Sequence, residues 1–205
     1  MIKKGVTDAQ PYHHANLRKT LLDAAVALIG EVGPRAFTLR EVARRAGVSH
    51  NAPYRHFASK DELLVAVAAE GFDRMIAVME KAMKPGKTPV ERLQLCGVGY
   101  VDFGLRWPQH LLAMFDLPAA ARNDCEVVGE NAFRVLLDSI VAAQRSGDLA
   151  AGDPLPLAWT AWSLVHGIAK LAISGNLPLS RRATIEFTRA ATLGLFEGMA
   201  TKKRG

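Results

Sequence analysis

The sequence predicts an all-α protein, with a small N-terminal three-helix unit followed by a larger helical bundle. Three observations support this fold class. Apolar residues recur every three to four positions, no useful length alternates with period two, and capping boxes and proline–glycine breaks cut the chain into helix-sized segments. A length of 205 residues suits one or two such units.

The N-terminal unit is expected to hold one long and two short helices. Apolar residues at helical spacing predict a first helix over 17–32, closed by the Gly-Pro pair that follows it. The capping box Thr38-Leu39-Arg40-Glu41 opens a second helix, which stops at Gly47. Ser49 can cap a third helix that runs to about residue 57.

Pro53 constrains that third helix. Proline inside a helix loses a backbone hydrogen bond and clashes with the preceding turn, at a cost of about 3 kcal/mol, so Pro53 must lie in the first turn. Either the helix begins one or two residues after Ser49, with His50 or Asn51 as the effective cap, or its first turn is distorted. The two alternatives place different side chains on the exposed face of this third helix.

The second unit is predicted to be helical throughout. Ser59-Lys60-Asp61-Glu62 opens a long helix that Pro85-Gly86 ends, and Thr88-Pro89-Val90-Glu91 is a further capping box. Gly167 lies in mid-helix, where glycine costs about 0.5 to 1 kcal/mol relative to alanine, so we expect another helix to pack closely against it. Further helices are expected at 89–106, 108–115, 123–146, 154–174 and 181–200.

The net charge of +6 is concentrated at the two ends of the chain. Residues 1–64 hold ten Lys and Arg against six Asp and Glu, whereas residues 65–200 hold thirteen against fourteen. The last five residues add three cations. Because a polyanion binder needs cations on its binding unit while a regulatory unit can be neutral, this distribution favours a nucleic-acid partner for the N-terminal unit.

Several classes of protein are disfavoured. No apolar stretch reaches the roughly 18 residues of a membrane span, and the N-terminus lacks the apolar core of a signal peptide, so we expect a soluble cytoplasmic protein. Cys96 and Cys125 are expected to be buried thiols, with a redox switch as the alternative. His13-His14 lacks further ligands at helical spacing, so no metal site is predicted. No nucleophile motif, phosphate loop or cofactor motif occurs, which disfavours an enzyme.

Residues 38–57 have the residue types of a helix-turn-helix. Ala43 is small where the two helices approach, Gly47 can adopt the positive φ of a tight turn, and Val48 supplies the apolar plug that follows. Phe57 and Leu63 are expected to bury against the first helix. The side chains left for the outer face are His50, Asn51, Tyr54 and Arg55.

Three groups of residues in this region resemble the N-terminal domain of the tetracycline-repressor (TetR) family. They are Phe37-Thr38-Leu39, Ala46-Gly47-Val48-Ser49 and Tyr54-x-His56-Phe57-x-x-Lys60. The resemblance covers roughly residues 15–64. It implies a basic arm over 1–14, a DNA-binding domain over 15–60, a ligand-binding and dimerisation domain over 61–200, and a basic tail over 201–205.

The resemblance also implies DNA-binding roles for particular residues. Positions near the phosphate backbone would be Thr38, Tyr54, His56 and Lys60. Positions nearer the bases would be Arg40, His50, Asn51, Ala52 and Arg55, with Ser49 as a further candidate. The alternative for Tyr54 and His56 is a role in the core of the small domain. Arg44 and Arg45 are interpreted as solvated residues on a helix face.

A second run, residues 161–171, resembles the tryptophan-histidine-glycine signature of one C-terminal domain class in the same family. It implies a dimer formed through the helices near 154–174 and 181–200. It also implies a ligand cavity lined by members of the set Tyr100, Phe103, Trp107, His110, Met114, Phe115, Trp162 and His166. Trp159 and Trp162 could instead be core residues, and His166 a satisfied buried histidine. Because no charges cluster in that set, the expected effector is apolar or weakly polar.

These observations predict a ligand-responsive repressor that binds a palindromic operator as a homodimer. Dimerisation follows from DNA recognition, because one short helix contacts only a few base pairs and a symmetric pair reads two half-sites. The alternative is a DNA-binding adaptor whose C-terminal half binds a protein instead of a small molecule. A cavity in that half would favour the ligand sensor, and a solid core would favour the adaptor.

Overall fold

The structure, a computed structural model, describes residues 14–116 and 119–198, and the side chains of 17–116 and 129–198. The described ranges contain no β-strand, which confirms the all-α prediction. Residues 1–13 of the expected basic arm, the whole basic tail and the side chain of Cys125 lie outside the described part, and His14 already belongs to the first helix. The elements are α1 (His14–Val32), α2 (Leu39–Arg45), the 3-10 helix η1 (Pro53–Arg55), α3 (Lys60–Met83), α4 (Pro89–Arg106), α5 (Pro108–Phe115), α6 (Ala119–Arg145), α7 (Pro154–Ile173) and α8 (Arg181–Gly198).

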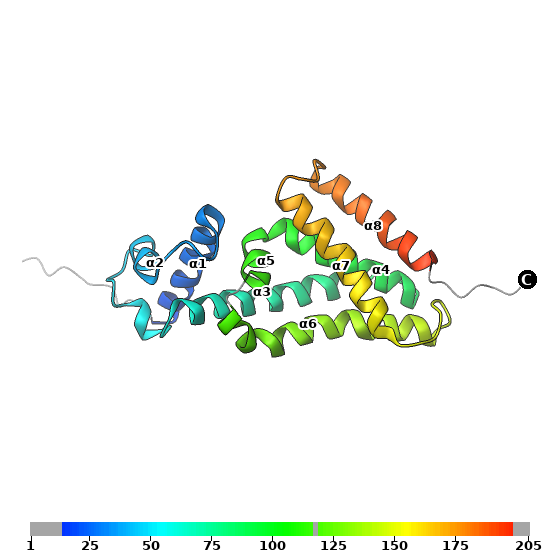
Figure 1. The fold of residues 1–205 in the computed structure, drawn as a ribbon, viewed down its shortest axis with the longest axis horizontal. Coiled ribbons are helices and arrows are strands. Elements are labelled where there is room, and N and C mark those ends of the chain that lie inside the picture. Colours follow the sequence, from blue (N-terminus) through cyan, green and yellow to red (C-terminus); the bar gives the residue numbers. More distant parts are fainter. Residues whose placement is uncertain (1–13, 117–118, 199–205) are drawn as a thin grey trace, which may run out of the picture.

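The elements form two groups joined by α3. In Figure 1, α1 and α2 lie at one end of the molecule, and α3 runs from that end along the larger bundle. Within the bundle, α3 packs against α4, α5 and α6, and α4 packs against α6, α7 and α8. Helix α5 contacts both α1 and α3, so it connects the two groups. None of the described helices is long and apolar enough to cross a membrane.

The N-terminal group is held by a compact core and a capped helix. Phe57 and Leu63 are fully buried with the apolar face of α1, as the sequence predicted. The capping box is complete: Thr38 Oγ1 accepts from the Glu41 amide at 3.3 Å, and the Thr38 amide donates to Glu41 Oε2 at 2.7 Å. The Thr38 hydroxyl also donates to Glu41 Oε2 at 2.9 Å, and this bond, together with the one from the Thr38 amide, lowers the pKa of the Glu41 carboxyl group. Gly47 has a φ of +68°, the conformation expected for the turn.

The segment after that turn differs from the prediction of an α-helix capped by Ser49. It forms the single 3-10 turn η1, whose N-cap is Ala52 and which has no side-chain cap hydrogen bond. Capping by Ser49, His50 or Asn51 is therefore wrong. Pro53 lies in the first turn, as predicted, but no α-helix continues from it. Because Pro53 has no amide hydrogen, it cannot donate to the Ser49 carbonyl oxygen, as a helix capped by Ser49 would require. Ser49 contributes its carbonyl oxygen, which accepts from the Ala52 amide at 2.9 Å.

The expected close packing at Gly167 is also not found within the chain. A Cβ atom built on Gly167 would meet no described atom within 4 Å. The close helix approaches lie elsewhere. A Cβ on Gly99 of α4 would lie 2.8 Å from Met79 Cα of α3, and one on Gly97 would lie 3.1 Å from Val165 of α7. The glycines of α4 therefore let three helices meet tightly, while Gly167 faces open space.

The remaining helix starts agree with their sequence signals. Thr88 and Glu91 form the full capping box at the start of α4, with Pro89 at its first position. At the start of α3, Ser59 Oγ accepts from the Glu62 amide at 3.1 Å. The carboxylate of Glu62 accepts from the Ala58 amide rather than from that of Ser59, so this second box is displaced by one residue.

Candidate nucleic-acid interface and ligand cavity

The predicted DNA-binding residues divide by exposure. Tyr54 is 51% exposed, which excludes the alternative that it packs in the core of the small domain. The exposed candidates are Thr38, Arg40, Ser49, His50, Asn51, Tyr54 and Arg55. The partly buried ones are Ala52, His56 and Lys60. The exposed set comes from the start of α2, the turn and η1, and α2 and η1 contact each other, so we refer to this set as the exposed edge.

His56 and Lys60 are tied to the domain itself. The Nε2 atom of His56 is buried and has no hydrogen-bond partner among the described atoms, which fits the alternative that His56 packs in the core of the small domain. Lys60 Nζ donates to the Arg35 carbonyl oxygen at 2.8 Å and lies 4.7 Å from the centre of the Phe37 ring. Burial lowers the pKa of the Lys60 ammonium group. An ammonium has three donors, so Lys60 keeps donors for another acceptor.

The neighbouring arginine Arg45 has a structural partner. Its guanidinium donates two hydrogen bonds to the Glu31 carboxylate, at 2.7 and 2.5 Å, and so joins α2 to α1. This contact lowers the pKa of Glu31 and raises that of Arg45. Because the pair is formally neutral, Arg45 adds little to the positive field of the domain, in agreement with its omission from the DNA-binding set.

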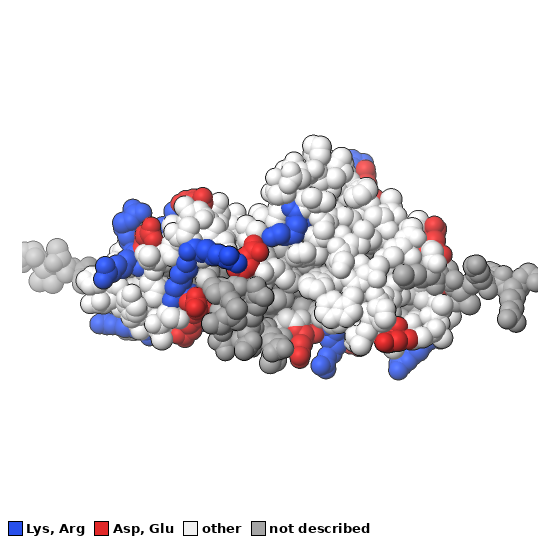
Figure 2. Space-filling view, in the orientation of Figure 1, with Lys and Arg blue, Asp and Glu red and all other residues white. Residues whose placement is uncertain are grey.

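Positive charge gathers on the N-terminal group. Figure 2 shows Lys and Arg side chains concentrated at the end of the molecule formed by α1 and α2, while the visible surface over α7 is largely uncharged. The exposed edge carries Arg40 and Arg55, and neither makes an ion pair with a described carboxylate. A surface of this kind can bind a phosphate backbone through cations and polar side chains.

The larger bundle contains a cavity of about 500 Å³. Side chains from α3, α4, α5, α6, α7 and α8 line it, and nearly all of them are apolar or aromatic. The volume is within the range of small-molecule sites in proteins. Three of the predicted ligand-binding residues are part of the cavity wall: Tyr100, Phe115 and Trp162. The other five predicted residues are not part of the wall: Phe103, Trp107, His110, Met114 and His166.

Most residues of the cavity wall were not predicted from the sequence. The missed residues include Phe72, Met75, Met79, Cys96, Phe133, Trp159 and Phe196. A core position was one of the alternatives for Trp159, yet this residue is 52% exposed and lines the cavity. The one available signal was the spacing of Trp159 and Trp162 on one face of α7. Helical periodicity alone does not separate an apolar face that meets another helix from one that meets a cavity.

Polar groups at one part of the cavity wall form a small network. The Tyr100 hydroxyl and His166 Nδ1 lie 2.7 Å apart, and Trp162 Nε1 donates to the same hydroxyl at 3.4 Å. Burial raises the pKa of Tyr100 and lowers that of His166. Both groups are therefore neutral at physiological pH, and His166 supports the cavity wall through Tyr100 without lining it.

The thiol of Cys96 also lines the cavity. It lies 3.9 Å from the sulfur of Met79, and burial raises its pKa to about 12. A thiol in this environment stays protonated and is a poor nucleophile. The expectation of a buried thiol at Cys96 is confirmed.

Helix α5 connects the cavity to the N-terminal group. Phe115, at its end, lines the cavity, while His110 is 4% exposed and neither ring nitrogen has a described partner. A Cβ on Gly30 of α1 would lie 3.1 Å from the side chain of Gln109. Helices α1 and α3 both pack on α5, so α5 contacts the N-terminal group as well as the cavity wall.

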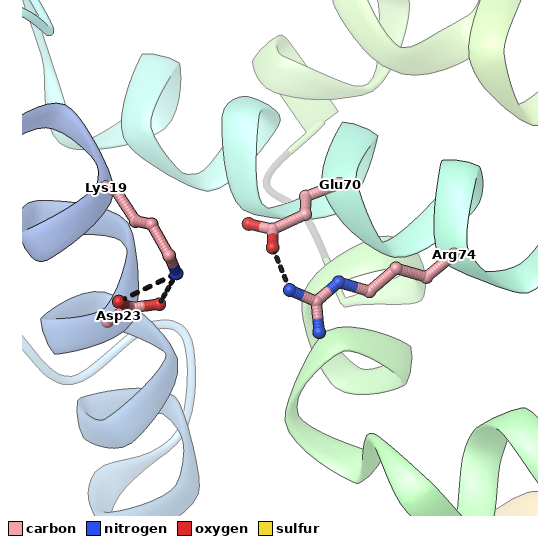
Figure 3. Close-up of polar contacts among 4 residues, drawn as sticks. All are labelled: Lys19, Asp23, Glu70 and Arg74. Atoms are coloured by element: carbon pink, nitrogen blue, oxygen red, sulfur yellow. Dashed lines mark hydrogen bonds and ion pairs between the residues drawn. The ribbon is translucent and has the colours of Figure 1, made fainter. Parts of the chain in front are cut away.

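Ion pairs occupy the facing sides of the two helices that meet α5. Figure 3 shows the Lys19–Asp23 pair of α1 opposite the Glu70–Arg74 pair of α3. Lys19 Nζ lies 3.0 Å from both Asp23 oxygens, and each pair closes within its own helix. No salt bridge in the described part joins these two pairs, and α1 and α3 are held together by their shared apolar core.

Comparison with known proteins identifies the family. Residues 21–67 match the family model described as bacterial regulatory proteins of the tetR family, and residues 93–193 match that of the tetracycline repressor-like C-terminal domain. The chain belongs to the TetR family. Because the TetR family consists of regulatory proteins, the expectation that the chain is not an enzyme is confirmed. The narrower tryptophan-histidine-glycine class stays a prediction.

Curated relatives match over part of the chain. The transcriptional repressor KstR of Rhodococcus jostii is 42% identical over 78 residues, which are 38% of this chain and 36% of that protein. The transcriptional regulator BetI of Rhizobium meliloti is 41% identical over 76 residues, 37% of each chain. The match therefore spans little more than a third of the length of these relatives.

Solved structures match over nearly the whole chain. A Rhodococcus sp. RHA1 protein of unknown function is 34% identical, with a TM-score of 0.80 over 94% of this chain and 100% of that one. FadR of Bacillus subtilis, solved in complex with stearoyl-CoA, is 18% identical, with a TM-score of 0.77 over 88% of this chain and 98% of that one. The second similarity supports the TetR fold alone.

Proposed function

We propose that this TetR-family chain is a transcriptional repressor that binds a palindromic DNA operator as a homodimer and releases it in response to a small molecule. The observation that carries the DNA-binding part is the exposed edge formed by Arg40, Tyr54 and Arg55 on a domain braced by two ion-paired helices. The tetR-family model matches residues 21–67, and the curated relatives include a named repressor and a named regulator of transcription.

The homodimer is supported by the outer face of α7 and α8. Large apolar side chains are exposed there: Leu171 is 49% exposed on α7, and Phe187 and Leu193 are 45% and 48% exposed on α8. Exposed apolar patches commonly mark protein interfaces. Gly167 of α7 and Gly194 of α8 have open space above them, which would let helices of a second copy approach closely.

The small-molecule response is supported by the cavity in the same bundle. The adaptor alternative predicts a solid core, and a space of about 500 Å³ lined by six helices argues against it. A ligand bound there contacts α5 through Phe115, and α5 also packs on α1. Such a ligand changes DNA affinity only by binding one arrangement of the two DNA-binding domains better than another.

The proposal is tested by selecting genomic fragments that the purified protein retains and measuring its mass by sedimentation at micromolar concentration. We expect a palindromic motif and a dimer. Leu193→Glu places a charge on the proposed interface and should give a monomer that binds the motif more weakly. Glu186→Gln, on the same helix but paired with Arg182, is the matched control and should remain dimeric. A monomeric wild-type protein, or no enriched motif, would contradict the proposal.

A further inference from the structure

We infer that the cavity selects an uncharged, ring-containing small molecule that carries one hydroxyl or carbonyl group. This inference rests on the proposed effector response and specifies its chemistry. It combines the charge, the aromatic content and the hydrogen-bonding groups of the cavity wall.

The charge of the wall excludes a buried anion. Among the described residues that line the cavity, Glu130 is the only charged one, and it is exposed to solvent. No described Lys or Arg lines the cavity. A carboxylate or phosphate taken inside would lose its hydration without gaining a counter-ion, which is strongly unfavourable. The negative charge of Glu130 would add repulsion.

The aromatic side chains of the wall form a continuous series. Ring centres are 6.0 Å apart for Phe72 and Phe115, 5.8 Å for Phe115 and Trp162, and 5.5 Å for Trp162 and Trp159. Phe133 extends the series, at 4.9 Å from Trp159. Aromatic rings attract one another in edge-to-face and offset geometries at such separations. A ligand with its own rings can join this series in a way that a flexible chain cannot.

The dimensions of the wall favour a compact body. On α4 the lining runs from Leu93 to Tyr100, and on α3 from Phe72 to Met79. At 1.5 Å per helical residue, each run spans about 10 Å. That length suits two or three fused rings and is short for a long extended acyl chain.

The hydrogen-bonding capacity of Tyr100 defines the head group. A phenol has one donor and two acceptor positions. If the hydroxyl donates to His166 Nδ1 and accepts from Trp162, one acceptor position remains for a ligand hydroxyl. If His166 carries its proton on Nδ1 and donates instead, the phenol proton is free for a ligand carbonyl. With either tautomer of His166, the Tyr100 hydroxyl can make one hydrogen bond to a neutral polar group of the ligand. Neither tautomer places a positive charge there.

The test uses three probes with one ring system: 9-methylanthracene, 9-anthracenemethanol and 9-anthracenecarboxylate. Binding is read from quenching of tryptophan emission in the Trp107→Phe variant, because Trp107 lies outside the cavity and the remaining Trp159 and Trp162 line it. We expect the alcohol to bind about 5-fold more tightly than the hydrocarbon. The carboxylate should bind at least about 10-fold more weakly than the alcohol.

A second variant tests the head-group assignment. Tyr100→Phe should reduce the affinity of the alcohol to that of the hydrocarbon, and leave the affinity of the hydrocarbon within about twofold. If Tyr100→Phe does not fold, the three-probe series on the parent protein still decides the charge argument. Tighter binding of the carboxylate, equal binding of all three probes, or no binding of any probe at its solubility limit would overturn the inference.

Failure of this inference is distinguishable from failure of the proposed function. DNA binding by the same protein is measured in parallel, by retention of genomic fragments. DNA binding together with a preference for the carboxylate would refute the effector chemistry and leave the repressor proposal standing. Binding of the alcohol without DNA binding would refute the repressor proposal and support the cavity assignment.

Discussion

Replacing Arg55 with alanine should weaken the salt dependence of DNA binding by a calculable amount. Arg55 is exposed on η1 and makes no ion pair with a described carboxylate, so its guanidinium is available to a phosphate. Each phosphate contact contributes about 0.9 to the slope of log affinity against log salt. A dimer loses two contacts, so the slope should fall by about 1.8. Between 50 and 200 mM salt, the wild-type protein should lose about 12-fold more affinity than the variant.

Fluorescence anisotropy with a labelled random-sequence duplex measures this slope and requires no knowledge of the operator. Arg145→Ala is the matched control, because it removes the same charge from an exposed position at the end of α6, in the other group of helices. Its slope should differ from that of the wild type by well under one. Equal slopes for the wild type and Arg55→Ala, or equal reductions in the two variants, would refute the assignment of Arg55 to the DNA-binding edge.

Three further predictions concern stability and are measured by urea denaturation. Thr38→Val removes the side-chain cap of α2 and should lower the free energy of unfolding by about 1 kcal/mol. Thr38→Ser keeps the capping hydroxyl and should retain most of the stability of the wild type. Gly71→Val should cost about 1 to 3 kcal/mol, because a Cβ there would lie 2.6 Å from Met114 Sδ; an unchanged value would show that Met114 moves freely. Burial, with a smaller contribution from Arg74, lowers the pKa of His110, so the unfolded chain binds the proton more readily. The free energy of unfolding should therefore fall as the pH drops through about 6.5, and His110→Leu should fall less.

Most helix boundaries could be predicted because their signals are local. Proline at the first position fixed the starts of α4 and α5, whose bounds agree with the expected 89–106 and 108–115. The segment after Gly47 could not be predicted to the same level. There the sequence supplied two conflicting signals, a capping serine and a proline four residues later, and only the backbone geometry decides between them.

The DNA-binding edge was predicted better than the cavity for a physical reason. Exposure of Arg40 and Arg55 follows from their place on short helices whose other faces must be buried. Met75 and Met79 lie on the buried apolar face that helical periodicity predicts for α3, yet that face meets a cavity. Whether an apolar side chain meets protein or an open space depends on how far apart helices from distant parts of the sequence lie.

Gly167 is a glycine in the middle of a helix, and the structure shows open space beside it. Glycine in mid-helix is less stable than alanine, which implies that another helix packs closely against it. No neighbouring atom of the described part lies within 4 Å of a Cβ atom placed at that position. On the same face of the bundle, Leu171 and Leu193 are about half exposed, which is unfavourable for an isolated chain. A second copy packed on α7 and α8 would account for both observations, because it would cover the leucines and provide the helix that Gly167 admits. The close neighbour that the sequence implies would then belong to the proposed partner subunit.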